Sequence, residues 1–308
     1  MRPSKSVSVS LITILILSLL TGCGGGDEGK NNSNANKEFV VGSANYTEQY
    51  IVGELLATLV EENMPDVKVM RKLGLNGTMV VHSAITNGDI DAAVEYTGSG
   101  LMQILHKDII MDPNEAYKVV KDNYHDKWHI KWLQPLGFNN TYAMAVKRDY
   151  AEANGLENSS DLSKVASKAT LGCSMEFSER PDGYPGWKQA YGMEFKEVIP
   201  MDPGLMYSSI KNDEVNVISA FSTDGRIPAF DLQILDDDKK FFPPYYAVPM
   251  VREDKLEEIP GLEELINKLG GKLNDKSMAG LNAKVDIDGM DAHEVAKEFL
   301  KEEKLIKN

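Results

Sequence analysis

Residues 83–100 read SAITNGDIDAAVEYTGSG, and residues 208–225 read SSIKNDEVNVISAFSTDG. The two stretches align without gaps, and each reads as the end of a helix, a polar turn, a short apolar strand, an aromatic residue and a small polar loop. The aromatic residues are Tyr96 and Phe221. Because ligands bind beyond the carboxyl ends of the strands in an open α/β sheet, this pattern predicts one α/β unit in each half of the chain, with both rings aimed at one cleft. The alternative is a chance similarity between two α/β units.

The rest of the body alternates strands with helices, which is typical of the α/β class. The pattern predicts a helix from Pro113, strands at Ile130–Leu136 and Tyr142–Lys147, a helix from Asp161, and strands at Thr170–Cys173 and Phe195–Met201. We expect two lobes, at 38–142 plus 248–308 and at 143–247, joined by a hinge of two crossings near residues 140–145 and 246–250.

The N-terminus indicates export. Arg2 and Lys5 precede an apolar run at 11–20, which is too short to span a bilayer and predicts a lipoprotein signal peptide at residues 1–22. The sequence Leu-Thr-Gly-Cys that ends at Cys23 resembles the lipobox of prokaryotic lipoproteins, which implies that this cysteine is acylated. Each buried acyl methylene contributes about 0.8 kcal/mol to membrane binding. Residues 23–37 would then be the lipidated cysteine and a flexible tether. The alternative is an uncleaved anchor helix with an incidental cysteine.

Composition limits the classes of partner. The formal net charge of −14 becomes −16 once Arg2 and Lys5 leave with the signal peptide, so we expect no binding to nucleic acid. The chain has 2 cysteines, Cys23 and Cys173, and the first is assigned to the lipid anchor. We therefore expect no internal disulfide, and we predict that Cys173 is a small buried apolar residue.

No constellation typical of an enzyme stands out, and we predict no catalytic residue, no metal and no cofactor. His125 and His129 are spaced as two metal ligands on one helix face, but no third ligand is near, and a solvated helix end is the interpretation that we favour. Asp182 and Asp224 lie in turns, where we expect their side chains to accept backbone N–H groups.

Aromatic residues gather at the expected strand ends. Tyr142 and Tyr245 lie at the two crossings, in addition to the rings of the repeated units, Tyr96 and Phe221. Four such rings suit a soft organic cation, because the faces of Tyr and Phe attract quaternary ammonium groups. The alternative is that these aromatic residues are ordinary core or hinge packing.

Several motifs follow one another in order along the chain. They are Gly42-Ser43-x-x-Tyr46-Thr47-Glu48-Gln49, Gly88-Asp89-Ile90-Asp91 with Glu95-Tyr96-Thr97-Gly98, Gly137-Phe138-Asn139-Asn140-Thr141-Tyr142, Arg180-Pro181-Asp182-Gly183-Tyr184, Phe221-Ser222-Thr223-Asp224-Gly225-Arg226 and Phe241-Phe242-Pro243-Pro244-Tyr245. With these motifs, the chain from Phe39 to about Leu305 resembles the substrate-binding proteins of osmoprotectant ABC importers, the glycine betaine/carnitine/choline receptors. The resemblance implies a two-lobed periplasmic-binding-protein fold of type II. Each lobe would be a mixed sheet flanked by helices, with the ligand in the cleft.

The resemblance also implies a ligand cage of four aromatic residues, namely Tyr96, Tyr142, Phe221 and Tyr245. Relatives usually have Tyr at the position of Phe221. A phenyl face still attracts a cation, although the hydroxyl is lost.

The ligand's carboxylate would meet polar side chains beside this cage. Arg180 aligns with an arginine that pairs with the betaine carboxylate in some relatives, and Ser99 and Asn45 would be auxiliary donors. Two departures bear on the choice of ligand. Ala44 stands where relatives often have Lys or Gln, and Ser99 stands where Thr is common and choline-restricted relatives have Asp.

The sequence as a whole therefore predicts a lipid-anchored receptor on the extracytoplasmic face of the cell membrane. We expect it to be a monomer that closes around a quaternary ammonium compound, such as glycine betaine, carnitine, choline or an ergothioneine-like betaine. Its partners would be an ABC permease and the ATPase of that permease. The alternative is an extracytoplasmic lipoprotein enzyme or sensor that acts on a small polar metabolite.

Overall fold

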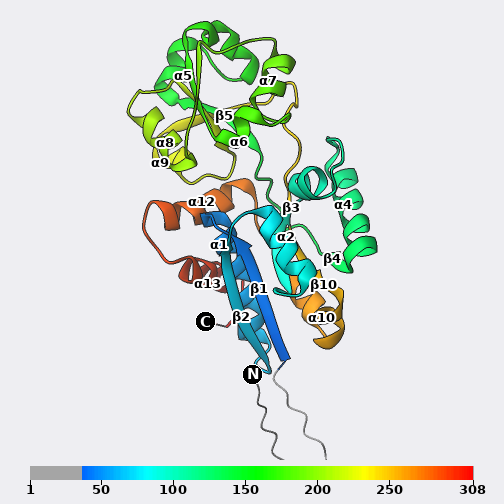
Figure 1. Cartoon of the computed structure of the whole chain (residues 1–308). Helices are drawn as coiled ribbons and strands as arrows, with labels where there is room; N and C mark the ends of the chain where they lie inside the picture. Colours follow the sequence, from blue (N-terminus) through cyan, green and yellow to red (C-terminus); the bar gives the residue numbers. More distant parts are fainter. Residues whose placement is uncertain (1–36, 308) are drawn as a thin grey trace, which may run out of the picture. The chain divides into compact units, whose positions relative to one another are not determined.

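The computed structural model describes residues 37–307, which form two mixed sheets of five strands flanked by helices (Figure 1). The predicted signal peptide at 1–22, the lipidation site Cys23 and all but the last residue of the tether lie outside the described residues. No helix among residues 37–307 is long and apolar enough to cross a membrane.

The first sheet has the strand order β2-β1-β3-β10-β4. Its strands are β1 (Lys37–Ala44), β2 (Val67–Leu75), β3 (Ala92–Tyr96), β4 (Ile130–Trp132) and β10 (Ala247–Arg252). Strand β1 pairs in parallel with β2 and β3, whereas β10 is antiparallel to β3 and β4. The helices of this part are α1 (Thr47–Asn63), α2 (Thr78–Asn87), α3 (Thr97–Ser99), α4 (Pro113–Trp128), α10 (Glu253–Glu258), α11 (Leu262–Ile266), α12 (Asp275–Asp286) and α13 (Ala292–Glu302), with a π-helical turn at Gly100–Ile104 and a 3₁₀ turn at Asn267–Leu269. We call this sheet with its helices lobe 1.

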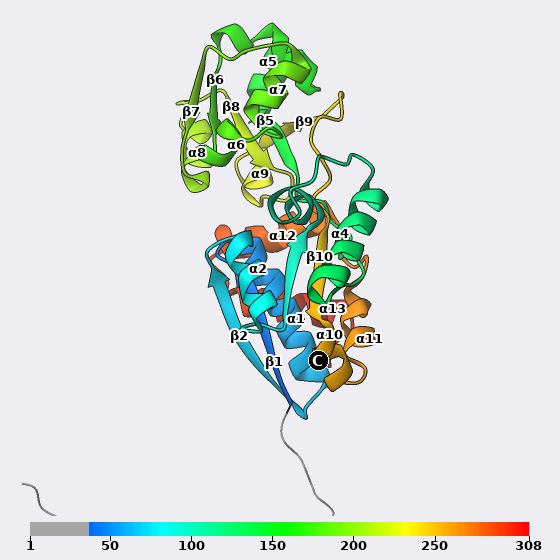
Figure 2. The same cartoon turned by 45° about the vertical axis from the view of Figure 1, so that its right-hand side comes forward.

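The second sheet has the strand order β7-β6-β8-β5-β9 (Figure 2). Its strands are β5 (Tyr142–Lys147), β6 (Thr170–Cys173), β7 (Glu197–Pro200), β8 (Val217–Phe221) and β9 (Leu232–Leu235). Its helices are α5 (Arg148–Asn154), α6 (Met175–Glu179), α7 (Tyr184–Tyr191), α8 (Pro203–Lys211) and α9 (Arg226–Ala229), with 3₁₀ turns at Ser159–Lys164 and Ala166–Lys168. We call this sheet with its helices lobe 2.

Both repeated units form as predicted. In lobe 1, α2 leads into β3, which ends at Tyr96; in lobe 2, α8 leads into β8, which ends at Phe221. Every residue of β3 is buried, and its successive side chains enter two different apolar clusters, which contain Val94 and Ala93 respectively. A strand that is buried on both faces has few polar positions, here Glu95 in β3 and Ser219 in β8, which explains why both units read as short, mostly apolar runs.

The chain passes between the lobes twice, at neighbouring positions. Asn139 and Tyr246 form an isolated antiparallel bridge, and the Asn140 N–H donates to the carbonyl of Tyr245 at 3.0 Å. The predicted crossings near residues 140 and 246 are therefore present. The domain limits at 38–142 plus 248–308 and at 143–247 stay a proposal, as does the role of these crossings as a hinge.

Three predicted elements are shorter or differently wound. The strand expected at Phe195–Met201 is β7, which spans only Glu197–Pro200. The strand expected at Ile130–Leu136 ends at Trp132, because Pro135 has no N–H to donate and the Gln134 N–H bonds the side chain of Asn267. The helix expected from Asp161 is a 3₁₀ turn from Ser159, where Asp161 and Asn158 form a capping box.

The thiol of Cys173 and two of the indole rings lie inside the lobes. Cys173 is fully buried at the end of β6, as predicted, and burial raises the pKa of its thiol to about 11. Trp132 is fully buried in lobe 1 and Trp187 in lobe 2, and Trp128 ends α4. These are the 3 tryptophans of the chain.

Candidate functional site

A cavity of about 880 Å³ is lined by residues of both lobes. It lies beyond the ends of β3 and β8, because Tyr96 and Phe221 both line it. All of the side chains proposed from the sequence as ligand contacts line this cavity, namely Asn45, Tyr96, Ser99, Tyr142, Arg180, Phe221 and Tyr245. The structure thus brings together residues that are far apart in the chain.

The four aromatic rings are held by the sheets in different ways. Tyr142 begins β5 and pairs with Phe221 across the antiparallel strands, with ring centroids 5.1 Å apart. Tyr245 precedes β10, and its ring rests on Gly98, where an added Cβ would lie 2.5 Å from the ring atom Cε1. Tyr96, Tyr142 and Tyr245 are each about 95% buried, whereas Phe221 is only partly buried. Three of the rings therefore also contribute to the cores.

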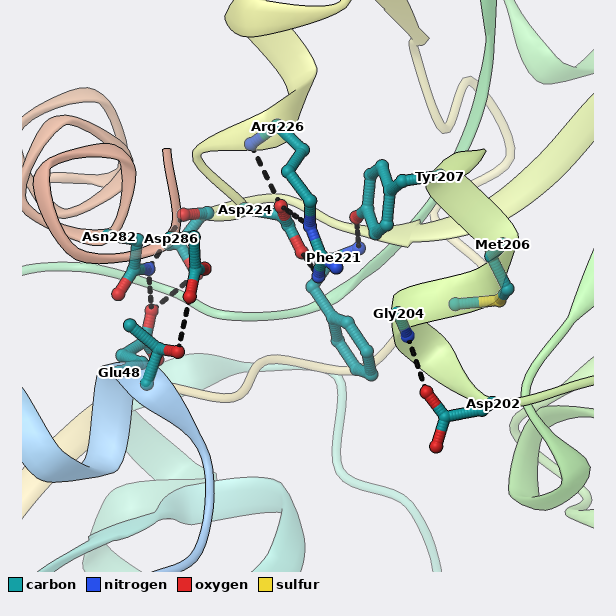
Figure 3. A network of polar contacts seen from close by, with 12 residues as sticks. Glu48, Asp202, Gly204, Met206, Tyr207, Phe221, Asp224, Arg226, Asn282 and Asp286 are labelled. Carbon is teal, nitrogen blue, oxygen red and sulfur yellow. Dashed lines mark hydrogen bonds and ion pairs between the residues drawn. The ribbon is translucent and has the colours of Figure 1, made fainter. Parts of the chain in front are cut away.

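Glu48, near the start of α1, forms a buried hydrogen-bond network at this cavity (Figure 3). Its Oε1 accepts from the Tyr96 hydroxyl at 2.5 Å and from Asn140 Nδ2 at 2.7 Å. Its Oε2 accepts from the Thr223 hydroxyl at 2.5 Å and from Asn282 Nδ2 at 3.1 Å. Burial raises the pKa of the Glu48 carboxyl group. The network joins lobe 1 to Thr223 in lobe 2.

Sequence reasoning assigned no role to Glu48, although its motif was recognised. A usable signal was present. Glu48 and Gln49 interrupt the start of α1, a helix whose next eleven residues include Ile51, Leu55 and Leu59 and are almost all buried. A charged residue on such a helix needs polar partners, and these can come only from other elements.

Arg180 is engaged by a neighbouring carboxylate. Its Nε donates to Asp182 Oδ1 at 2.8 Å, and its Nη2 donates to Asp182 Oδ2 at 2.7 Å and to the Tyr245 hydroxyl at 2.7 Å. The Tyr245 hydroxyl also donates to Asp182. Only Nη1 of the guanidinium group has no partner among the described residues. The prediction that Asp182 caps backbone N–H groups is wrong, because its two oxygens are taken by these side chains.

Arg226 is paired in the same way with Asp224, three residues after Phe221 (Figure 3). Its Nε donates to Oδ1 at 2.8 Å and its Nη2 to Oδ2 at 2.5 Å, while the guanidinium carbon lies 3.9 Å from the ring centroid of Tyr207. Asp224 also accepts the Arg226 backbone N–H at 2.9 Å, so the predicted backbone contact is confirmed at this turn. Both arginines that line the cavity are therefore neutralised by a neighbouring aspartate.

The two auxiliary donors differ in their surroundings. Ser99 is about 92% buried, and its hydroxyl has no hydrogen-bond partner among residues 37–307. Asn45 is exposed, and its Nδ2 lies 3.5 Å from Asn76 Oδ1. The backbone N–H of Ala44 donates to Gln49 Oε1 at 3.3 Å.

The histidine pair lies elsewhere in lobe 1. His125 Nδ1 is 2.5 Å from Glu253 Oε1, and His129 Nδ1 is 3.9 Å from Glu253 Oε2. Along the part of the chain that the structure describes, no group of three or more His, Cys, Asp or Glu side chains is arranged to hold a metal ion.

This geometry can be set beside known proteins. Residues 37–302 match the model of the OpuAC family, which is described as the substrate binding domain of the ABC-type glycine betaine transport system. The chain belongs to the OpuAC family. Members of this family are extracytoplasmic substrate-binding components of ABC importers, which work with a permease and an ATPase, and they are not enzymes.

Individual OpuAC relatives cover most of the chain. The carnitine transport binding protein OpuCC of Listeria monocytogenes serotype 1/2a (strain 10403S) is 39% identical over 263 residues, which are 84% of this chain and 85% of the relative. A glycine-betaine-binding protein of Pseudomonas aeruginosa strain PAO1 is 34% identical over 277 residues, which are 86% of this chain and 88% of that protein.

A solved structure agrees with the fold. The crystal structure of a glycine betaine/carnitine/choline ABC transporter protein is 34% identical and superposes with a TM-score of 0.81, covering 87% of this chain and 100% of that one. The prediction of a type II periplasmic-binding-protein fold is confirmed.

Proposed function

We propose that the cavity binds a quaternary ammonium compound in a cage formed by Tyr96, Tyr142, Phe221 and Tyr245. The observation that carries this proposal is that the four rings, two of them at equivalent strand ends of two sheets, line one cavity. A ring face within about 6 Å attracts such a cation through the quadrupole of the ring. The carnitine and glycine betaine named for the relatives, together with choline, are the ligands that we consider first.

The charges of the cavity support a cationic group. Five carboxylates line it, from Glu48, Glu176, Asp202, Asp224 and Asp286, against the two arginines Arg180 and Arg226. Because Asp182 and Asp224 already neutralise these arginines, the lining carries an excess of negative charge. A permanent cation is attracted to such a lining, and a cage of ring faces lets it shed water without needing to donate hydrogen bonds.

The carboxylate of a betaine would meet donors at one side of the cage. Ser99 offers a buried hydroxyl that lacks a partner among the described residues, and Arg180 offers Nη1. Asn45 would be an outer donor at the exposed margin of the cavity.

We further propose that the protein acts as a monomer anchored to the outer face of the membrane. The support for the anchor is the lipobox-like sequence that ends at Cys23, followed by the polar tether. In this arrangement the receptor delivers its ligand to the permease of the importer while the acyl chains keep it near the membrane.

Calorimetry tests the binding function. The soluble body from Lys37 is titrated with glycine betaine, carnitine, choline and the matching primary amines. We expect saturable binding of at least one trimethylated compound and much weaker binding of its primary amine, because the cage recognises methyl surface and diffuse charge. Equal binding of glycine and glycine betaine contradicts the cage, and turnover of a titrated compound favours the enzyme alternative.

A further inference from the structure

The four hydrogen-bond donors of Glu48 favour the ionised form of its carboxyl group, whereas burial raises its pKa. Each of its four partners is a neutral group that donates a hydrogen, namely the hydroxyls of Tyr96 and Thr223 and the amides of Asn140 and Asn282. The two amide NH₂ groups can only donate, and the two hydroxyls donate when the carboxyl group is ionised. With four donors aimed at its two oxygens, the network is complementary to the ionised form.

Along the described part of the chain, the buried carboxylate of Glu48 has no counter-ion. Among residues 37–307, no Lys, Arg or His nitrogen forms an ion pair with Glu48, which is only 3% exposed. The two buried carboxylates that hold the arginines of the cavity differ, because Asp182 is paired with Arg180 and Asp224 with Arg226. A buried charge is costly unless an opposite charge or several hydrogen bonds compensate it. Glu48 has the hydrogen bonds but not the opposite charge.

We propose that the positive charge of the bound ligand is the counter-ion of Glu48, and that Glu48 acts on this charge through the ring of Tyr96. The inference rests on the proposed function, since it assumes a cationic ligand in the cage. Tyr96 connects Glu48 to the proposed cage, because its hydroxyl donates to Glu48 while its side chain lines the cavity. A hydroxyl that donates to a carboxylate makes its ring richer in electrons, which strengthens the attraction of the ring face for a cation.

Glu48 is thus a positioning residue that also sets the preference for charge. It fixes the orientation of Tyr96, and it adds a negative potential that a neutral ligand of the same shape cannot use. Two unit charges one tyrosine ring apart attract by an amount that corresponds to on the order of tenfold in Kd, at an effective dielectric constant of about 20.

The variant Glu48→Gln isolates the charge. The amide oxygen of Asn140 has no hydrogen-bond partner among the described residues, and Asn140 Nδ2 donates only to Glu48. If the Asn140 amide turns over, its oxygen can accept from the new Gln amide group, while the Gln oxygen still accepts from Thr223 and Asn282. The Tyr96 hydroxyl, which donated to Oε1, then accepts from the same amide group. The variant therefore removes the charge and the hydrogen bond that Tyr96 donates, while each neighbour of residue 48 keeps a hydrogen bond.

Glu54→Gln is the matched control. Glu54 is also a buried glutamate of α1, but it pairs with Arg71 at 2.8 Å and His293 at 3.0 Å, and it does not line the cavity. The Glu54→Gln substitution removes a buried carboxylate that, unlike Glu48, has counter-ions inside the protein.

The experiment compares each trimethylammonium compound with a compound of the same shape in which a carbon replaces the nitrogen, so that the positive charge is absent. Choline is paired with the neutral alcohol 3,3-dimethylbutan-1-ol, and glycine betaine with tert-butylacetate, which keeps the carboxylate. Binding of each compound is measured by calorimetry, and thermal unfolding is followed with and without the compound for the wild type and both variants.

We expect Glu48→Gln to weaken the trimethylammonium compound by about tenfold or more, and to weaken the carbon counterpart, which lacks the positive charge, by less than about threefold or not at all. The unliganded variant should unfold at an unchanged or higher temperature, and its stabilisation by the ligand should shrink. Glu54→Gln should leave the ratio of the two affinities unchanged. A lower unfolding temperature of unliganded Glu48→Gln with an unchanged ratio overturns the inference and makes Glu48 a structural residue. If the wild type binds none of the trimethylammonium compounds, the proposed function fails instead.

Discussion

The two walls of the cavity hold their buried carboxylates in opposite ways. On the lobe 1 side, Glu48 meets only neutral donors, whereas on the lobe 2 side the buried Asp182 and Asp224 are each paired with an arginine two residues away. A carboxylate that is paired within the protein contributes to stability and adds little attraction for a charged ligand. A carboxylate without a counter-ion destabilises the empty protein and favours a bound cation. Asp182 and Asp224 therefore stabilise the fold, whereas Glu48 selects the charge of the ligand.

The largest expected effect concerns stability on the lobe 2 wall. Asp182→Asn leaves the largely buried Arg180 without its partner, and we expect the free energy of unfolding to fall by about 3 kcal/mol. Urea unfolding of the unliganded protein measures this change. Glu48→Gln is the control on the other wall and should change the free energy of unfolding by less than about 1 kcal/mol. Equal losses in the two variants would remove the distinction between the walls.

Truncation of a cage ring should come next in size. Phe221→Ala should weaken a trimethylated ligand by about 2 kcal/mol, the magnitude of a desolvated cation–π contact. Because Phe221 is only partly buried, its loss should cost less stability than Tyr142→Ala, which also removes contacts with Phe177 and Phe242. Calorimetry and urea unfolding are compared for both variants. Unchanged affinity in Phe221→Ala would show that the ring is packing alone.

A smaller effect is expected for recognition of the carboxylate. Since Nε and Nη2 of Arg180 are engaged by Asp182, only Nη1 can meet a ligand. Arg180→Ala should therefore weaken glycine betaine by only about 1 kcal/mol more than choline, the net value of a single hydrogen bond. Arg180→Lys, which keeps the charge, is the control for the ion pair. A much larger difference between the ligands would mean that the guanidinium group leaves Asp182 when a carboxylate binds.

The smallest expected effect is that of salt. Charges inside a cavity are screened less than exposed charges, so raising the salt concentration from about 0.1 M to about 1 M should change the affinity by less than about 0.5 kcal/mol. Titrations at several salt concentrations measure this dependence. A steep loss of affinity would place the deciding charge at the exposed margin, near Asn45, rather than at Glu48.

The sequence predicted the parts of the site that depend on local pattern. The repeated units placed Tyr96 and Phe221 at strand ends, because the period of the apolar residues and the polar turns defines each strand within a few residues. The strand at Tyr142–Lys147 was predicted with its observed limits. These features can be predicted because they depend only on residues that are near one another in the sequence.

The network around Glu48 could not be predicted in this way. Its donors come from four separate segments, and Asn282 is 234 residues away in the chain. The partner of Asp182 was missed for a different reason. An aspartate in a turn can accept a backbone N–H or pair with a nearby arginine, and the sequence does not distinguish the two. Tertiary packing decides both cases.

The positions of the tryptophans have a practical consequence for spectroscopy. None of the three indole rings lines the cavity, and Trp132 and Trp187 are fully buried in separate lobes. The intrinsic emission of the protein therefore originates away from the ligand, and a flat fluorescence titration says little about occupancy. A tryptophan introduced as Phe221→Trp would put an emitting ring on the cavity wall, where its signal reports directly on the bound cation.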